Sequence, residues 1–244
     1  MWKSLYDSAW HNPGIFALAA FFLLIWLIVW PKHAPSLRHL RVLVAGLAVV
    51  VLADIALTGG LSPLAPAHRH WIGYVAIPFV ILGDARVFLL FEQELARSTV
   101  QDPARSLKTY GRALAMALIV PVLQAILLQL FPSMFAQRRR LFLAYELMFL
   151  PVLLGYIRVR VQPALVARAQ RLTQHTWLQG GKWLSLLGVF VFAQYALWAL
   201  ADVMILAGLD AGYLVRFVPN AMYYALFLPF AYGSAPSDRA TDET

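Results

Sequence analysis

Long apolar blocks occupy most of the chain, and they constrain its fold more than any other feature of the sequence. Each block holds about 20 residues, which is the length that an α-helix needs to cross roughly 30 Å of hydrocarbon. The blocks lack the polar face of a helix that packs on a soluble core, and they lack the short alternating segments of a membrane β-barrel. The sequence therefore predicts an all-α, polytopic membrane protein.

Seven of these blocks are expected to be transmembrane helices, and residues 1–232 are expected to form one domain. Tryptophans near several block ends fit the aromatic belt of a membrane interface, among them Trp10, Trp30, Trp71, Trp177 and Trp183. The polar residues 233–244 are interpreted as a disordered cytoplasmic tail. The predicted helices are Ile15–Trp30, Leu40–Thr58, Ile72–Phe91, Arg112–Phe131, Leu141–Ile157, Trp183–Ala207 and Gly212–Tyr232.

The charged segments between the helices predict the orientation of the chain. The formal net charge of +8 comes mostly from Lys and Arg in these segments, so we interpret it as a topological signal and expect no nucleic-acid partner. The distribution of Lys and Arg between the two sides favours an inner-membrane protein with its N-terminus outside and its C-terminus in the cytoplasm. Glu92–Tyr110 is then a cytoplasmic loop, and Arg158–Gly181 extends the fifth helix to a break at Gly180-Gly181. The run Arg138–Arg140 falls on the outer side, and the sequence gives no reason for it.

An internal echo indicates a repeat. Leu52–Leu61 reads LADIALTGGL and Leu200–Leu209 reads LADVMILAGL, with Leu, Ala, Asp, Gly and Leu at matching places. The third and seventh predicted helices also open alike, with GYVAIP at Gly73–Pro78 and GYLVRFVP at Gly212–Pro219. We interpret the pattern as a parallel 3+1+3 arrangement, in which helices 1–3 correspond to helices 5–7. Coincidence between similar apolar helices is the alternative.

The predicted repeat resembles the layout of SWEET and PQ-loop transporters, in which parallel repeats surround an axis along the membrane normal. The resemblance is one of layout, since no PQ motif stands at a helix end. Seven helices with an outer N-terminus also resemble a microbial rhodopsin. That family needs a lysine in its seventh helix for retinal, and Gly212–Tyr232 contains none. Retinal is therefore excluded, and no cofactor is expected.

Charged side chains inside the predicted helices are the candidates for a functional site, because a charge in hydrocarbon is costly. Asp202 and Arg216 lie equally far from Leu209 in a short turn, so we expect an ion pair between neighbouring helices. The pair could alternatively only fix the helix hairpin. Asp54 and Glu146 are expected at a similar depth, where converging acids would suit proton coupling unless the headgroups keep them hydrated.

Polar residues at helical spacing predict two faces that line a cavity. The spacing of about four residues places the members of each set on one side of their helix. Isolated amides of this kind also serve as contacts between membrane helices, so the pattern carries the prediction. One face holds Gln194, Trp198 and Asp202, and the other holds Arg216, Asn220 and Tyr223.

A further aspartate, Asp84, is predicted past the middle of the third helix. Arg86 lies on a different side of that helix, so Asp84 needs a partner on another helix, while Arg86 is free to snorkel towards the interface. The pair Gly83-Asp84 is similar to the Gly-Asp of intramembrane aspartyl proteases and lysoplasmalogenase-like hydrolases, which use paired aspartates. Ile81 stands where the protease motif has glycine.

Motifs for other chemistry are missing from the sequence. There is no cysteine, which excludes thiolate and iron–sulfur chemistry, and there is no H-x-x-x-H or H-E-x-x-H metal motif. The sequence thus favours a carrier of a small solute or ion over an enzyme, with proton coupling as one way to drive it. The alternatives are a hydrolase of lipid or peptide that pairs Asp84 with Asp54 or Asp202, and a non-catalytic scaffold or sensor.

Overall fold

All secondary structure in the described part of the chain is helical, which confirms the all-α prediction. The structure is a computed structural model and describes residues 1–8, 13–29, 37–58, 69–96, 103–169 and 174–236. Several predictions concern residues outside these ranges: Trp10 and Trp30 in the aromatic belt, Gly60 and Leu61 in the first repeat copy, and most of the tail.

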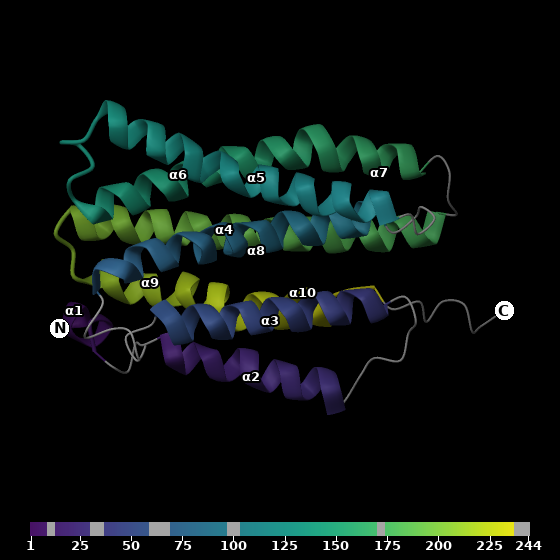
Figure 1. Cartoon of the computed structure of the whole chain (residues 1–244), viewed down its shortest axis with the longest axis horizontal. Coiled ribbons are helices and arrows are strands. Elements are labelled where there is room, and N and C mark those ends of the chain that lie inside the picture. The colour runs from purple at the N-terminus through teal and green to yellow at the C-terminus, as the bar shows by residue number, and fades with distance from the viewer. Residues whose placement is uncertain (9–12, 30–36, 59–68, 97–102, 170–173, 237–244) are drawn as a thin grey trace. The chain divides into compact units, whose positions relative to one another are not determined.

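Each predicted apolar segment lies largely within a helix, and Figure 1 shows their arrangement. The elements are α1 (Trp2–Tyr6), α2 (Pro13–Val29), α3 (Arg38–Thr58), α4 (Arg69–Ala96), α5 (Pro103–Leu130), α6 (Arg138–Tyr156), the π-helix η3 (Ile157–Val161), α7 (Gln162–Ala169), α8 (Gln174–Leu206), α9 (Ala211–Ala221), the π-helix η4 (Met222–Leu226) and α10 (Phe227–Gly233).

Two predictions about the connecting segments were wrong. Glu92–Tyr110 is not a loop throughout, because α4 continues to Ala96 and α5 begins at Pro103. Gly180 and Gly181 do not break a helix, because they lie inside α8. A glycine in a helix costs only about 1 kcal/mol relative to alanine, so packing around it can keep the helix intact. The predicted extension of the fifth helix is confirmed as far as Ala169, through η3 and α7.

Five helical stretches in the described residues are long and apolar enough to cross a membrane. Their number indicates a multi-pass membrane protein, in agreement with the composition. The other two predicted spans lie in α2, which has 17 residues, and in α4, which has 28. The five stretches are Arg38–Thr58, Leu107–Leu130, Arg138–Ala167, Gln179–Leu206 and Ala211–Gly233.

The chain divides into two compact units. Unit 1 contains Met1–Lys3 and Val80–Pro219, and unit 2 contains Ser4–Phe79 and Asn220–Thr244. In unit 1, α6 packs along α8 and against α5, and α7 packs against α8. In unit 2, α2 packs on α3 and η4, and α10 packs on α3. Two of the divisions fall beside helix prolines, Pro78 and Pro219, where the ring removes a backbone hydrogen bond.

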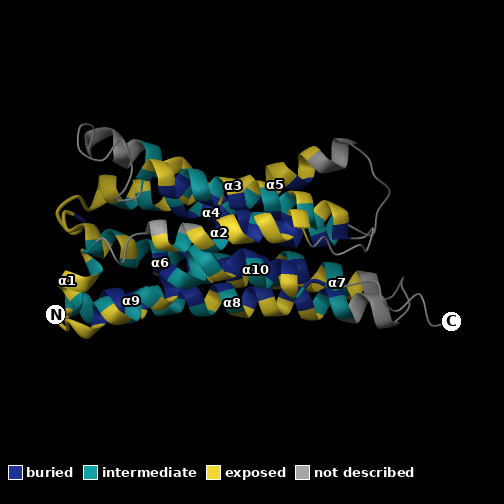
Figure 2. Ribbon diagram, turned by 90° about the horizontal axis from the view of Figure 1, so that it is seen from below, coloured by how far each residue is buried: buried dark blue, intermediate teal, exposed yellow. Residues whose placement is uncertain are grey.

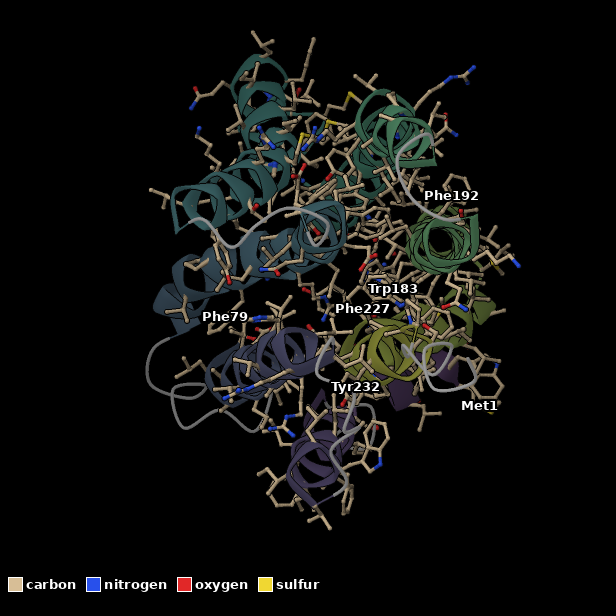
Figure 3. All side chains as sticks on the ribbon, turned by 90° about the vertical axis from the view of Figure 1, so that its right-hand side faces the viewer. Met1, Phe79, Trp183, Phe192, Phe227 and Tyr232 are labelled. Atoms are coloured by element: carbon tan, nitrogen blue, oxygen red, sulfur yellow. The ribbon has the colours of Figure 1, made fainter. Side chains whose placement is uncertain are left out.

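Aromatic side chains form much of the core of unit 1. The ring of Phe149 stacks on Tyr195 with centroids 3.8 Å apart, and Phe88 and Phe91 both meet Tyr156 edge-on. Helix α8 has mixed burial, as the blue and yellow patches in Figure 2 show. Its Trp183 is 3% exposed whereas its Phe192 is 38% exposed, and both are labelled in Figure 3. One side of α8 is therefore buried in the unit, and another side is exposed.

Unit 2 has its own aromatic contacts. Trp26 of α2 packs edge-on against Tyr232 of α10, with centroids 5.3 Å apart, and Phe16 stacks on Tyr224. Phe227 and Tyr232 are completely or almost completely buried and are labelled in Figure 3. The apolar faces of these helices thus find partners within the unit.

The short turn between α8 and α9 also holds the start of the chain. Asp210 accepts hydrogen bonds from the backbone N–H groups of Trp2 and Lys3, at 2.8 and 2.9 Å, and from the terminal ammonium of Met1 at 3.0 Å. These donors, the Trp2 N–H first, hold the pKa of the Asp210 carboxyl below its usual value. The contact ties α1 to the α8–α9 turn.

Candidate functional site

Four charged side chains meet inside unit 1, and we call them the arginine–carboxylate cluster: Arg139 and Glu146 of α6, Asp202 of α8 and Arg216 of α9. Nη1 of Arg216 bonds Oδ1 of Asp202 and lies 3.3 Å from Oε1 of Glu146. Nη1 of Arg139 donates to the same Asp202 oxygen at 3.1 Å. The predicted ion pair between Asp202 and Arg216 is confirmed, and Glu146 joins it.

Close packing of α9 on α8 creates this geometry. Gly208 has φ of +82°, a left-handed backbone that glycine adopts at low cost, and it lets the chain turn tightly. At Gly212 an added Cβ would lie 2.8 Å from the carbonyl oxygen of Ala201 and 2.9 Å from the backbone nitrogen of Ile205. Because only hydrogen fits there, α9 approaches α8 closely. Arg216 follows about one helical turn later and meets Asp202.

The cluster is buried and balanced in charge. Asp202 is 0% exposed and Glu146 is 4% exposed, so each carboxylate needs compensation for its lost hydration. Two arginines supply it, and Arg139 also places its guanidinium 5.8 Å from the ring centre of Tyr213. The side chain of Arg139 is 20% exposed, so it connects buried Asp202 with the protein surface.

The carboxylates of the cluster keep unused hydrogen-bonding capacity. Within the described part of the chain, Oδ2 of Asp202 and Oε2 of Glu146 are buried and accept no hydrogen bond. The same holds for Oε1 of Gln194, which is 2% exposed on α8. Buried acceptors are satisfied in the great majority of cases, so three spare oxygens in one unit point to a role beyond packing.

A second polar group, the tyrosine–aspartate site, lies in the same unit. Asp84 of α4 is 1% exposed and accepts hydrogen bonds from the hydroxyls of Tyr145 on α6 and Tyr195 on α8, one at each carboxylate oxygen. The prediction that Asp84 finds its partner on another helix is confirmed. Arg86 is only 3% exposed, so the expectation that it snorkels towards a surface was wrong.

A third polar group surrounds Glu92, near the end of α4. Arg160 of η3 binds the carboxylate with two hydrogen bonds of 3.0 and 3.2 Å, and the Tyr156 hydroxyl donates at 3.0 Å. Arg112 of α5 lies 3.6 Å from the second oxygen. The carboxylate is 2% exposed, whereas the Arg160 and Arg112 side chains are 41% and 54% exposed. The group joins α4, α5 and α6–η3 at one buried charge.

The remaining predicted site residues are distributed over the two units. In unit 1, Trp198 meets Tyr195 edge-on at 5.2 Å. In unit 2, Asp54 accepts a hydrogen bond of 2.7 Å from Thr58 one turn along α3, Asn220 is 9% exposed, and Tyr223 packs edge-on against Tyr224. The contacts of the described residues thus bring together Glu146, Asp202 and Arg216 among the nine candidates.

Sequence reasoning missed Arg139 as a partner of Asp202, missed Tyr145 and Tyr195 as partners of Asp84, and missed the whole group around Glu92. Arg139 was visible only as part of a charge run that contradicted the predicted topology, and its contact with Asp202 gives one member of that run a role. The tyrosines each stand beside a predicted site residue, Glu146 or Gln194, but aromatic side chains are too common in membrane helices to single them out.

In comparisons with known proteins, no family model, no curated protein and no solved structure matches the chain. No group of three metal-ligating side chains occurs among the residues that the structure describes. The residues themselves therefore define the class, a multi-pass helical membrane protein with buried charged groups.

Proposed function

We propose that this protein is an inner-membrane carrier of a small solute or ion, and that the arginine–carboxylate cluster is its polar binding site. The observation that carries the proposal is the pair of buried carboxylate oxygens, on Asp202 and Glu146, that accept no hydrogen bond from the described residues. The proposal includes the seven spans, the outer N-terminus and the parallel repeat predicted from the sequence.

A carrier explains the spare acceptors better than a structural cluster does. An ion pair that only fixes a hairpin is most favourable when all its hydrogen-bonding atoms are used, because each unpaired buried acceptor costs about 1–3 kcal/mol. A solute with an N–H or O–H group would satisfy these oxygens, and a cation would do so as well. The part-exposed Arg139 offers a route to them, because its displacement would open Asp202 to the surface.

The hydrolase alternative receives less support from the contacts. It requires two aspartates that share a proton. Asp84 is held by two tyrosine hydroxyls, and Asp202 is held by two arginines, so each carboxylate has its own set of partners. The scaffold alternative predicts that the acids are dispensable for any transport, which the following experiment examines.

The proposal is tested by counterflow in liposomes that contain the purified protein. Vesicles preloaded with one unlabelled compound at a time, from a panel of amino acids, amines, carboxylates and sugars, receive a trace of the same compound in labelled form. We expect transient accumulation for at least one compound, and a reduction of at least about tenfold in Asp202→Asn, as expected for a lost charged hydrogen bond of about 1.5–3 kcal/mol.

The matched control is Asp210→Asn, the same change of charge in the exposed turn eight residues further along the chain. This variant should transport at the wild-type rate. Equal counterflow in Asp202→Asn and wild type would remove the cluster from the binding site. Absence of counterflow for every compound in the panel would contradict the carrier.

A further inference from the structure

We infer that Asp84, Tyr145 and Tyr195 form a proton-binding site, at which one proton is taken up and released in each transport cycle. The inference rests on the proposed carrier function and names its coupling ion. It assigns the solute and the proton to different places: the solute to the arginine–carboxylate cluster, and the proton to the tyrosine–aspartate site.

The chemistry of the partners distinguishes Asp84 from the other buried acids. A guanidinium can only donate hydrogen bonds, so a carboxylate held by arginine loses bonds when it is protonated. A tyrosine hydroxyl donates or accepts according to its rotation. With a hydroxyl at each oxygen, Asp84 keeps both hydrogen bonds as a carboxylate and as a carboxylic acid.

The proton step needs only one new bond and one rotation. A hydronium ion loses one proton and becomes water, and the proton forms an O–H bond with one Asp84 oxygen. The hydroxyl facing that oxygen turns from donor to acceptor. The second tyrosine continues to donate to the other oxygen. Release reverses both changes and returns the proton to water, so the site cycles without breaking its connection to α6 or α8.

Three other buried carboxylates of unit 1, those of Asp202, Glu92 and Glu146, lack this property. Asp202 is bound by Arg139 and Arg216, and Glu92 is bound by Arg160 and Arg112 with only one tyrosine. Glu146 contacts Arg216 through Oε1, its Oε2 accepts no hydrogen bond from the described residues, and no tyrosine hydroxyl among them donates to either oxygen.

The surroundings of the site suit a ligand as small as a proton. Tyr195 is 3% exposed and is stacked on Phe149 at 3.8 Å, and Trp198 covers it edge-on. A face-to-face stack at this distance leaves no room for a solute between the rings. A proton needs no cavity, and the aromatic packing around Tyr195 excludes bulk water from the space between the rings.

The neighbours link the site to the proposed solute site. From α6, Tyr145 faces Asp84 and stands next to Glu146 in the sequence; from α8, Tyr195 faces it about two turns before Asp202. Arg86, on the same helix as Asp84, places a positive charge near the site. Any shift of α6 against α8 that rearranges the solute site therefore also changes the distance between the two hydroxyls.

The test is an infrared titration of the purified protein in lipid nanodiscs, without any solute. A buried carboxylic acid has a carbonyl stretch apart from the amide bands, and its intensity follows protonation. We expect one such band to titrate in wild type, to persist in Glu146→Gln and Asp202→Asn, and to be absent from Asp84→Asn. In Tyr195→Phe, which keeps the ring stack, it should move to higher wavenumber because the carbonyl loses a hydrogen-bond partner.

The outcomes separate this inference from the carrier function. A band that disappears in Glu146→Gln and remains in Asp84→Asn would overturn the inference, as would the absence of any titrating band in wild type. If Asp84→Asn does not fold, an unchanged band in both Tyr145→Phe and Tyr195→Phe would overturn it equally. Counterflow does not enter this measurement, so its failure would contradict the carrier and leave the infrared result standing.

Discussion

Two aspartates of unit 1 are buried to the same degree and are held in opposite ways. Asp202 is 0% exposed and lies between two arginines, and Asp84 is 1% exposed and lies between two tyrosines. The first arrangement compensates a fixed negative charge with fixed positive charges. The second compensates it with neutral hydroxyls that can reverse their hydrogen bonds.

The difference separates two tasks that one buried acid performs poorly. A carboxylate between arginines stays charged and keeps its geometry, which suits recognition of a polar solute. A carboxylate between hydroxyls can change its charge without losing its contacts, which suits the coupling ion. If the contrast holds, variants of the arginine-held site should lose more stability than variants of the tyrosine-held site.

Arg216→Ala should destabilise the protein most. It removes the cation that contacts both Asp202 and Glu146 and leaves two buried carboxylates with Arg139 alone. Breaking a buried ion pair in this way costs about 3–5 kcal/mol. The free energy of unfolding, measured by titration with a denaturing detergent, gives the effect. Arg138→Ala is the control, since Arg138 is exposed and its loss should change stability by less than about 0.5 kcal/mol. Equal losses of unfolding free energy in Arg216→Ala and Arg138→Ala would contradict the view that the arginine–carboxylate cluster is stabilised by its ion pairs.

Gly212→Ala should separate α9 from α8. The arginine–carboxylate cluster would then be disturbed although none of its own residues is changed. The new methyl group would meet backbone atoms of Ala201 and Ile205 within 3 Å, and overpacking of this kind costs about 1–3 kcal/mol. Gly155→Ala in α6 is the control, because an added Cβ there meets no described atom within 4 Å. Counterflow should fall in Gly212→Ala and persist in Gly155→Ala. Wild-type stability and transport in Gly212→Ala would show that α9 can be held without this close approach.

Tyr195→Phe should cost less than the loss of Arg216, about 1–3 kcal/mol, because it removes one hydrogen bond from a neutral donor to the Asp84 carboxyl group. The phenyl ring keeps the stack on Phe149, so the packing is preserved. Detergent unfolding measures this difference on the same scale as that of Arg216→Ala. A loss as large as that of Arg216→Ala would mean that the hydroxyl compensates a permanent charge, and the contrast between the two sites would fail.

Asp210→Asn should have the smallest effect and supplies an exposed reference for both buried aspartates. The pKa of Asp210 lies below the usual 3.8, so its contribution to stability is present above that value and is lost as the pH falls through the folded-state pKa. The melting temperature of the variant should be slightly lower than that of wild type near pH 7, and the two should converge as the pH falls through the folded-state pKa of Asp210. A constant difference across this range would show that the charge of Asp210 is not responsible.

The fold was largely predictable because hydrocarbon imposes a simple rule on sequence. A span needs about 20 apolar residues, so the helices were located from composition alone. Their ends were predicted less well, since Glu92–Ala96 and Gln174–Lys182 continue helices into segments that carry polar side chains. Hydrogen bonding within a helix does not stop where the apolar residues stop, and contacts such as those of Glu92 with Arg160 stabilise the extra turns.

The candidate site was predictable only in part. Asp202 and Arg216 were paired correctly because a short turn fixes the relative depth of two adjacent helices. Arg139, Tyr145 and Tyr195 could not be found in this way, since they lie far along the chain from the acids they contact, on helices whose rotation the sequence leaves open. Their separations from the acids they contact are 63, 61 and 111 residues. Contacts at such separations depend on tertiary packing, which helical spacing does not encode.

In the proposed cycle, the tyrosine-held aspartate couples transport to protons, while the arginine-held cluster binds the solute. Its most direct test compares two assays on Asp84→Asn in liposomes, with a compound that wild type carries: counterflow without a pH gradient, and accumulation driven by one. We expect counterflow at a rate near that of wild type and no gradient-driven accumulation. Accumulation by Asp84→Asn equal to that of wild type would contradict it.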